Sequence, residues 1–400
     1  MGLEEAHRGR FDSGSGFVSL NNFTSSIVNA ALGNYSNLQS LDLSSNSVNG
    51  DISELLEGLS GCCNSSLKEL ILGSNKFNGK LPDSLGHLNY LRSLVLNDNL
   101  ISGPILESIG RLFFLKELDL SFNEMNGSIP TSLGRLTELT KLQLFHNSWK
   151  GLVSQNHLQG LAKLRVFSID MLYLSNNQIG GVVPNSLGFS LVDLSFNHLE
   201  GTIPLWPNIT FLFLNNNLFS GAIPWTIGSV MSLLITLNLS GNSLNCTIPL
   251  SICKLNALIG IYLSDNHLSR QIPIHLGDLR VLGSIDLSQN NLSGHVPELM
   301  CSLSFLYWLR LSGNPELCGL SLSTKCSAAI DVDAKDKDGK KMVDNMEDDE
   351  LETRFRHRRG GSSPDPFQSL FWTGRDYFGS LGPTTYPPLY KFSYDVPLKS

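Results

Sequence analysis

The sequence is poor in charge and has no long apolar runs. Charged residues make up 16% of its 400 residues, and 29 basic against 36 acidic side chains give a net charge of −7. Without a basic excess, the chain lacks the electrostatic signature of a nucleic-acid-binding protein. No run of 18 apolar residues occurs, so we expect no membrane span. The first 17 residues hold no apolar segment, so we expect no signal peptide in them.

Recognisable catalytic motifs are also missing. The nine histidines are scattered without the spacing of metal ligands, which argues against a metal centre. There is no phosphate-binding loop, nucleophile elbow or kinase signature. Asp119, Asp193 and Asp286 recur in similar tetrapeptides, and two carboxylates on one face could suggest a glycosidase. Because they belong to a repeated pattern, we interpret them as solvated or strand-capping groups and predict neither an enzyme nor a cofactor.

Asparagine, in contrast, recurs at regular intervals. Twelve units follow the pattern L-x-x-L-x-L-x-x-N, and the commonest spacing between their asparagines is 24 residues. These residues, which we call the asparagine ladder, are Asn46, Asn75, Asn99, Asn123, Asn147, Asn177, Asn197, Asn217, Asn242, Asn266, Asn290 and Asn314. A fixed period of this kind predicts a solenoid, and this motif predicts leucine-rich repeats.

The physical roles within one unit follow from its alternation. In the unit that ends at Asn123, a short strand points Leu118 and Leu120 inward and Glu117 and Asp119 outward. A single unit cannot bury its leucines, whereas stacked units bury them in a continuous core. The asparagine amide can satisfy backbone groups of its own turn and of the adjacent turn. The predicted fold class is an α/β-type repeat solenoid with a parallel β-sheet on its concave face.

A second signature follows each asparagine, with glycine four residues later and proline seven residues later. Gly127 and Pro130 are one example, while Cys246 and Arg270 replace the glycine in two units. The full pattern, L-x-x-L-x-L-x-x-N-x-L-x-G-x-I-P, resembles the plant-specific leucine-rich repeats of receptor kinases, receptor-like proteins and polygalacturonase inhibitors. The resemblance covers about residues 37–326 and implies a plant-specific leucine-rich repeat superhelix.

Three stretches resemble one group in that class, the ethylene-inducing xylanase receptor-like group of plant receptor-like proteins. They are TIPLSICKLNALIGIYLSDNHLS, LDLSFN, and DKDGKK after the last repeat. The resemblance implies a kinase-less defence receptor on the extracellular face of the plasma membrane. It also implies a protein or peptide ligand on the concave face and signalling through co-receptor kinases. The alternative is a secreted inhibitor of a microbial cell-wall-degrading enzyme, similar to polygalacturonase inhibitors.

The chain departs from that group in the middle and at both ends, and at its start we expect neither the signal peptide nor the N-terminal cap of the group. It continues as FRHRRGGSSPDPF where the group has its membrane helix, and the spacing from Asn147 to Asn177 is 30 residues. A truncated or mis-spliced gene model would explain these departures, and so would a shortened soluble paralogue.

We divide the chain into five segments. Residues 1–36 are a disordered start with a degenerate repeat, 37–317 hold about 12 repeats, and 318–326 form a C-terminal cap. Residues 327–353 are an acidic linker too polar to fold alone, and 354–400 are a disordered tail.

Seven cysteines leave at least one thiol unpaired or paired outside the chain. By resemblance to the cap of plant ectodomains, Cys318 and Cys326 would form a disulfide. Adjacent cysteines rarely pair, so we expect one buried and one exposed thiol at Cys62 and Cys63. A local bridge between Cys246 and Cys253 remains open.

N-x-S/T sequons favour an extracellular location. The candidate glycosylation sites are Asn22, Asn34, Asn64, Asn126, Asn208, Asn245 and Asn291. We leave out an eighth sequon at Asn238, because a glycan there would block the concave surface.

The outward side chains of the concave strands form the expected binding surface. Aromatic residues and arginine dominate interface hot spots, which makes them the ligand-binding candidates. These are Tyr173, Phe211, Phe213, Tyr262, Tyr307, Trp308 and Arg310. For Phe211 and Phe213 the alternative is packing against neighbours across the irregular units.

Overall fold

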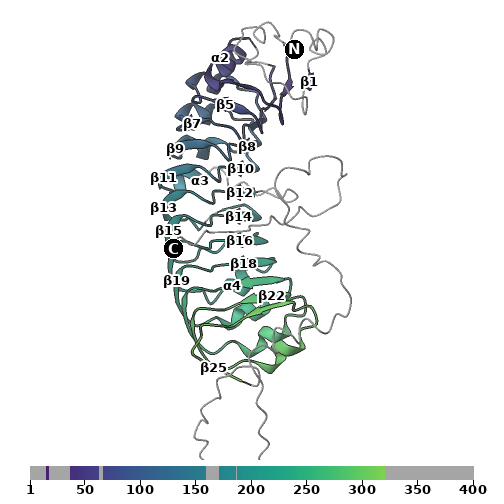
Figure 1. Cartoon of the computed structure of the whole chain (residues 1–400), viewed down its shortest axis with the longest axis vertical. Helices are drawn as coiled ribbons and strands as arrows, with labels where there is room; N and C mark the ends of the chain where they lie inside the picture. The colour runs from purple at the N-terminus through teal and green to yellow at the C-terminus, as the bar shows by residue number, and fades with distance from the viewer. Residues whose placement is uncertain (1–14, 18–36, 63–65, 159–170, 186, 320–400) are drawn as a thin grey trace, which may run out of the picture. The chain divides into compact units, whose positions relative to one another are not determined.

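The structure, a computed structural model, describes residues 15–17, 37–62, 66–158, 171–185 and 187–319. All of them belong to the first of two compact units, Met1–Ala334. Each repeat makes one circuit through a short strand, a turn, a second short strand and usually a short helix (Figure 1). The acidic linker and the tail lie outside the described residues, as do Cys63, Cys326, Asn22, Asn34 and Asn64.

One strand from each repeat joins a 13-stranded parallel sheet in chain order, which we call the large sheet. Neighbouring repeats are in register, so Leu94, Leu118 and Leu142 lie side by side and are fully buried. The strands are β1 (Ser15–Phe17), β2 (Ser40–Asp42), β4 (Glu69–Ile71), β6 (Ser93–Val95), β8 (Glu117–Asp119), β10 (Lys141–Gln143), β12 (Met171–Tyr173), β14 (Leu191–Asp193), β16 (Phe211–Phe213), β18 (Thr236–Asn238), β20 (Gly260–Tyr262), β22 (Ser284–Asp286) and β24 (Trp308–Arg310).

A second parallel sheet, absent from the sequence-based prediction, lies on the other side of the stack (Figure 1). Its ten strands are β7 (Ser102–Gly103), β9 (Glu124–Ser128), β11 (Ser148–Leu152), β13 (Gln178–Val182), β15 (His198–Gly201), β17 (Leu218–Ala222), β19 (Ser243–Cys246), β21 (His267–Arg270), β23 (Asn291–His295) and β25 (Glu316–Cys318). Strands β3 (Asn49–Asp51) and β5 (Lys76–Asn78) pair separately. Most strands of the second sheet carry the glycine of the second signature, which suggested a turn rather than a strand.

Short helices close most of the circuits. The α-helices are α2 (Ile52–Cys62), α3 (Gln155–Leu158) and α4 (Ile227–Val230). The 3-10 helices are η3 (Asp83–His87), η4 (Glu107–Arg111), η5 (Thr131–Arg135), η7 (Leu250–Lys254), η8 (Ile274–Asp278) and η9 (Glu298–Ser302). Pro130, with φ −74° and ψ 145°, precedes η5 in the extended conformation that proline favours.

The asparagine ladder joins each repeat to the one before it. Asn123 Nδ2 donates to the carbonyl oxygens of Leu120 and Ser121 in its own turn and of Leu96 in the preceding repeat, at 3.2, 3.1 and 3.0 Å. Its Oδ1 accepts the Ile101 N–H at 3.0 Å. The same four bonds recur at every ladder position from Asn75 to Asn290. The amide therefore pairs buried backbone groups that would otherwise lack partners.

The residue before each ladder asparagine is left-handed in all twelve repeats. Its φ is between 51° and 73°, even where it is an aromatic residue such as Phe122 or Phe196. This conformation turns the chain sharply out of the large-sheet strand and aims the asparagine inward.

The irregular spacing after Asn147 leaves the large sheet unbroken. Strand β10 pairs directly with β12, with Leu142 opposite Leu172. Residues 159–170, between α3 and β12, lie outside the described residues.

The two 20-residue repeats, which end at Asn197 and Asn217, have no helix among their described residues. The fully buried side chains of Phe189 and Trp206 fill their cores instead, and Trp206 Nε1 donates to the Pro184 carbonyl at 3.0 Å. Trp206 stands where a longer repeat has a leucine at the end of its helix, such as Leu112, whereas Phe189 takes the place of the first leucine of the motif.

The start of the chain departs from the sequence-based division. Residues Ser15–Phe17, which we assigned to a disordered start, form β1 and pair with β2, Gly16 opposite Leu41. Three residues in extended conformation complete hydrogen bonds along the edge of the first repeat, a contribution that residue composition does not reveal.

Asn123→Ala should lower the free energy of unfolding by roughly 1–3 kcal/mol, because it leaves buried backbone groups unpaired. Urea denaturation followed by circular dichroism measures the change. Asn126→Ala, three residues later and exposed, is the matched control and should leave stability unchanged. Equal losses for the two variants would contradict a shared-amide role for the ladder.

Arg270→Gly should raise the free energy of unfolding by roughly 0.5–1 kcal/mol, because Arg270 holds φ +67° where other repeats have glycine. The converse change, Gly294→Ala, imposes a side chain at φ +80° and should destabilise. Thermal unfolding of both variants checks the opposite signs, and a shift of the same sign in both would refute the strain argument.

Candidate binding surface

The large sheet presents its side chains in columns that cross the repeats. The central outward position of each strand forms one column because neighbouring strands share the same register. From the first repeat to the last it reads Asp42, Ile71, Val95, Asp119, Gln143, Tyr173, Asp193, Phe213, Asn238, Tyr262, Asp286 and Arg310. We call this series the central column.

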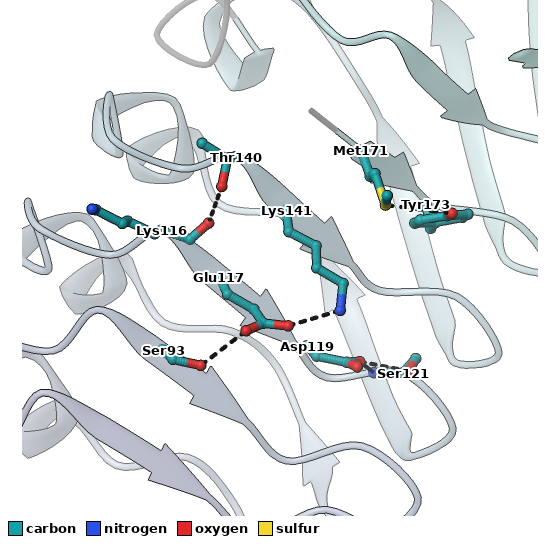
Figure 2. A network of polar contacts seen from close by, with 9 residues as sticks. All are labelled: Ser93, Lys116, Glu117, Asp119, Ser121, Thr140, Lys141, Met171 and Tyr173. Carbon is teal, nitrogen blue, oxygen red and sulfur yellow. Dashed lines mark hydrogen bonds and ion pairs between the residues drawn. The ribbon is translucent and has the colours of Figure 1, made fainter. Parts of the chain in front are cut away.

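A polar network links three strands in the N-terminal half of the surface (Figure 2). The Glu117 carboxylate on β8 accepts hydrogen bonds from Ser93 Oγ on β6 at 3.0 Å and from Lys141 Nζ on β10 at 2.7 Å. Both charged side chains are about one-third exposed, so the ion pair contributes little to stability, at most ~1 kcal/mol. Its main effect is to neutralise two charges locally.

The aspartates of the central column cap the ends of their strands. Asp119 Oδ1 accepts the Ser121 N–H at 3.0 Å and the Ser121 hydroxyl at 2.6 Å. The same turn occurs at Asp42 with Ser44, at Asp193 with Ser195 and at Asp286 with Ser288. Asn238 makes it with Ser240 through its amide oxygen.

From the sequence, these aspartates were interpreted as solvated or strand-capping groups. Two of them are not solvated, which corrects the first interpretation. Asp119 is 8% exposed and Asp193 only 1%. Burial raises the pKa of both carboxyls, and the hydrogen bonds from Ser121 and Ser195 offset this only in part. They lie three strands apart, about 14 Å by strand spacing, which is wider than a glycosidase carboxylate pair.

Four of the predicted site residues gather at the C-terminal end of the surface. Trp308 is 47% exposed, Tyr307 is also exposed, and the Arg310 guanidinium carbon lies 5.5 Å from the centre of the Trp308 ring. Tyr262, two strands away on β20, is half-buried, and burial raises the pKa of its hydroxyl. We call Tyr262, Tyr307, Trp308 and Arg310 the C-terminal patch.

The two tyrosine rings of the patch occupy space beside glycines that a side chain there would fill. A Cβ at Gly260 would meet Tyr262 Cε2 at 3.0 Å, and one at Gly283 would meet Tyr307 Cε1 at 2.7 Å. The glycines therefore let both rings approach the sheet closely.

The other three candidates lie elsewhere. Tyr173 is wrong as an exposed anchor, because it is only 7% exposed, with its ring 5.9 Å from Phe145 and its hydroxyl 3.7 Å from the Met171 sulfur. Phe211 and Phe213 on β16 are half-buried, and Phe213 lies two strands before Tyr262, with Asn238 between them.

An aromatic cluster that we did not predict lies where β8 and β10 turn inward. The Phe122 ring stacks on His146 at 4.5 Å and meets Phe145 edge-on at 5.1 Å. Burial lowers the pKa of His146. The signal in the sequence is an aromatic residue at a left-handed position just before a ladder asparagine, where serine, aspartate, asparagine and glycine are more usual.

The sequons lie mainly off the large sheet. Asn126, Asn245 and Asn291 are exposed on second-sheet strands, and Asn208 is half-buried in a short repeat. Asn238 lies on β18 of the large sheet, with its amide oxygen engaged by Ser240. A glycan on any of the first three would leave the large sheet uncovered.

The cysteines settle one open question. Cys246 and Cys253 are free thiols, so the local bridge between them does not form, and burial raises the pKa of Cys253 to about 11. Cys318 is buried and disulfide-bonded. Its pairing with Cys326 stays a prediction. In the described parts of the chain, no helix has the length and hydrophobicity to cross a bilayer.

Asp193→Asn should preserve the turn and raise stability at neutral pH, since Asn238 makes the same turn without a charge. The folded state raises the pKa of Asp193, so wild-type stability falls as pH rises from the unfolded value through the folded one. The variant loses that dependence, and its advantage should grow over this window and then level off. Urea denaturation across the acid range measures it.

Asp286→Asn is the control, because the same turn is half-exposed there. An advantage of Asp193→Asn that persisted unchanged to the lowest pH would contradict this account.

Comparisons with known proteins agree with the geometry. A family model described as Leucine Rich Repeat matches residues 37–59, 66–88, 90–112, 114–136, 168–190, 233–255 and 282–303. No curated protein matches the sequence.

Solved structures of plant receptors are similar to the chain. A TDR receptor is 30% identical with a TM-score of 0.68, covering 75% of this chain and 54% of that one. The Arabidopsis HAESA ectodomain, solved with an IDA peptide hormone ligand, is 32% identical with a TM-score of 0.63, covering 74% and 55%. The Arabidopsis GASSHO1/SCHENGEN3 ectodomain, solved with CASPARIAN STRIP INTEGRITY FACTOR 2, is 32% identical with a TM-score of 0.60, covering 72% and 37%.

The chain thus spans about half or less of the length of these receptors' ectodomains. Its fold is an open leucine-rich-repeat solenoid with a parallel sheet on the concave face, structurally similar to the ectodomains of plant receptor kinases.

Proposed function

We propose that the chain is the ligand-recognition module of a kinase-less plant receptor-like protein that binds a protein or peptide on the large sheet. The observation that carries this proposal is the C-terminal patch, where aromatic rings and an arginine are exposed together on a rigid sheet. Such side chains supply most binding energy in protein interfaces. The HAESA structure, with a peptide hormone on a similar fold, supports a ligand of this kind.

The patch is preorganised for contact. Trp308 and Arg310 stand on the same strand, so the ring holds the guanidinium in place, and the two tyrosines lie close to glycines. Fixed side chains lose little conformational entropy when a ligand binds, which favours affinity. The second sheet presents a different surface, with three exposed sequons and few aromatic groups.

The finer assignment rests on the sequence resemblance. Similarity to the ethylene-inducing xylanase receptor-like group supports a role in pathogen perception at the extracellular face of the plasma membrane. Because the sequence holds no kinase signature, a signal would pass through partner receptor kinases.

Peptides selected on the wild-type chain from a random display library test the proposal. Trp308→Ala should weaken their binding at least tenfold, because it removes an interface anchor of the kind worth about 2 kcal/mol or more. Trp225→Ala is the matched control, since Trp225 is 81% exposed just before α4 and away from the large sheet.

Fluorescence anisotropy gives both affinities, and thermal unfolding checks that both variants fold. Unchanged binding by Trp308→Ala, or an equal loss from Trp225→Ala, would place the ligand elsewhere and contradict the proposal.

A further inference from the structure

A second group of exposed aromatic side chains lies outside the large sheet, at the points where the chain enters its strands. Tyr90 and Phe114 stand immediately before the first leucine of their repeats, and Phe113 precedes Phe114. All three side chains are about half exposed, and the rings of Tyr90 and Phe114 stack nearly parallel, with their centroids 5.9 Å apart. Scattered apolar residues on a surface need no explanation, whereas a contiguous group of large rings is typical of an interaction site.

A row of cations accompanies these rings. Each stacked ring is followed two residues later by a cation, Arg92 or Lys116, and Lys68 takes the same position in the repeat before them. The three residues lie side by side, because the Arg92 N–H donates to the Lys68 carbonyl at 2.6 Å and the Lys116 N–H to the Arg92 carbonyl at 2.7 Å. The described residues at this position of the later repeats are Thr140, Ser190, Thr210, Ile235, Ile259, Gly283 and Tyr307. Among the described repeats, the cations are therefore confined to three neighbours.

The charges of this row are not compensated within the described residues. Arg92 and Lys116 are exposed, and neither takes part in an ion pair or a side-chain hydrogen bond there. The Lys68 ammonium donates to an uncharged amide, Gln39 Oε1, at 2.8 Å. Figure 2 shows the Lys116 ammonium pointing away from Glu117, whose carboxylate is paired with another lysine.

The surrounding charges leave this edge basic. Arg111, the last residue of η4 and three residues before Phe114, adds a further exposed cation. Two acids border the edge, Glu138 in the next repeat and Glu69, which accepts a hydrogen bond from Ser40 Oγ at 2.9 Å. Four cations against two acids give a local excess of positive charge in a chain whose net charge is −7.

We propose that this edge docks a partner protein through a segment that combines acidic and apolar side chains. We call it the entry surface, and it consists of Lys68, Tyr90, Arg92, Phe113, Phe114 and Lys116. Charge complementarity determines the partner, since its carboxylates pair with Arg92 and Lys116 while its apolar side chains pack on the rings. Aromatic residues and arginine are enriched at protein interfaces, which favours a protein over an acidic polysaccharide.

The entry surface is separate from the proposed ligand site. Its residues precede the strands of the N-terminal repeats, whereas the C-terminal patch lies on β20 and β24 and just before β24. Because exposed charges mainly speed association and are screened by salt, binding at the entry surface should weaken as ionic strength rises.

The test uses a fluorescently labelled Gly-Ser peptide that carries three glutamates and two phenylalanines. Two comparison peptides carry glutamine in place of glutamate or serine in place of phenylalanine. Fluorescence anisotropy with the full chain should show the first peptide binding about tenfold more tightly than either comparison peptide, the factor that one interface anchor provides. Equal affinities for the glutamate and glutamine peptides would overturn the proposal, and so would binding of polygalacturonate without binding of the peptide.

Variants localise the effect. Arg92→Glu should weaken the glutamate peptide severalfold and tighten a matching peptide with lysine in place of glutamate, a gain that a poorly folded variant cannot imitate. Phe114→Ala should also weaken the glutamate peptide. Phe305→Ala is the matched control, because Phe305 is exposed at the same position of the last repeat and has no cation two residues later. An equal loss from Phe305→Ala, or no gain for the lysine peptide with Arg92→Glu, would refute the entry surface.

Competition separates this proposal from the proposed function. Peptides whose binding depends on Trp308 should not displace the glutamate peptide, and displacement would place it on the C-terminal patch and contradict the entry surface. If the entry surface fails while Trp308→Ala still weakens the selected peptides, the proposed function stands without it.

Discussion

The structure depends on one shared hydrogen-bonding unit, the amide of the ladder asparagine. In the repeat that ends at Asn123, this group donates to carbonyls of two repeats and accepts an N–H from the preceding one. A side chain that belongs equally to two turns fixes how one repeat sits on the next. Stacking without a constant relation between repeats would leave buried backbone groups unpaired.

The binding surface follows from that constant relation. Because neighbouring strands always pair in the same register, outward residues at equivalent positions line up across the sheet. Leucines fill the core in every repeat, so the outward positions are free to differ. The polar network around Glu117 and the C-terminal patch are two chemically distinct regions on one regular framework. Stability is thus carried by the inward face of the strands, and the proposed recognition by their outward face.

The periodic features were predictable from the sequence, whereas those set by packing between repeats were not. The spacing of Leu118 and Leu120 before Asn123 predicts an inward alternation, and both leucines are fully buried. The second sheet was missed because a glycine such as Gly294, at φ +80°, suggests a turn, although its strand pairs with β25. The burial of Tyr173 depends on Phe145 and Met171 from its surroundings, which no single repeat reveals. For the same reason, the sequence did not indicate that the Trp206 side chain would fill the core of a repeat without a helix.

Hydroxyl-radical footprinting of the full chain, with and without a peptide selected on it, tests the central claim that the large sheet recognises the ligand. Bound peptide should lower the oxidation of Tyr262, Tyr307 and Trp308 and leave that of Trp225 and Leu218 unchanged, because the latter two are exposed away from the large sheet. Protection of Trp225 or Leu218 without protection of Trp308 would contradict it.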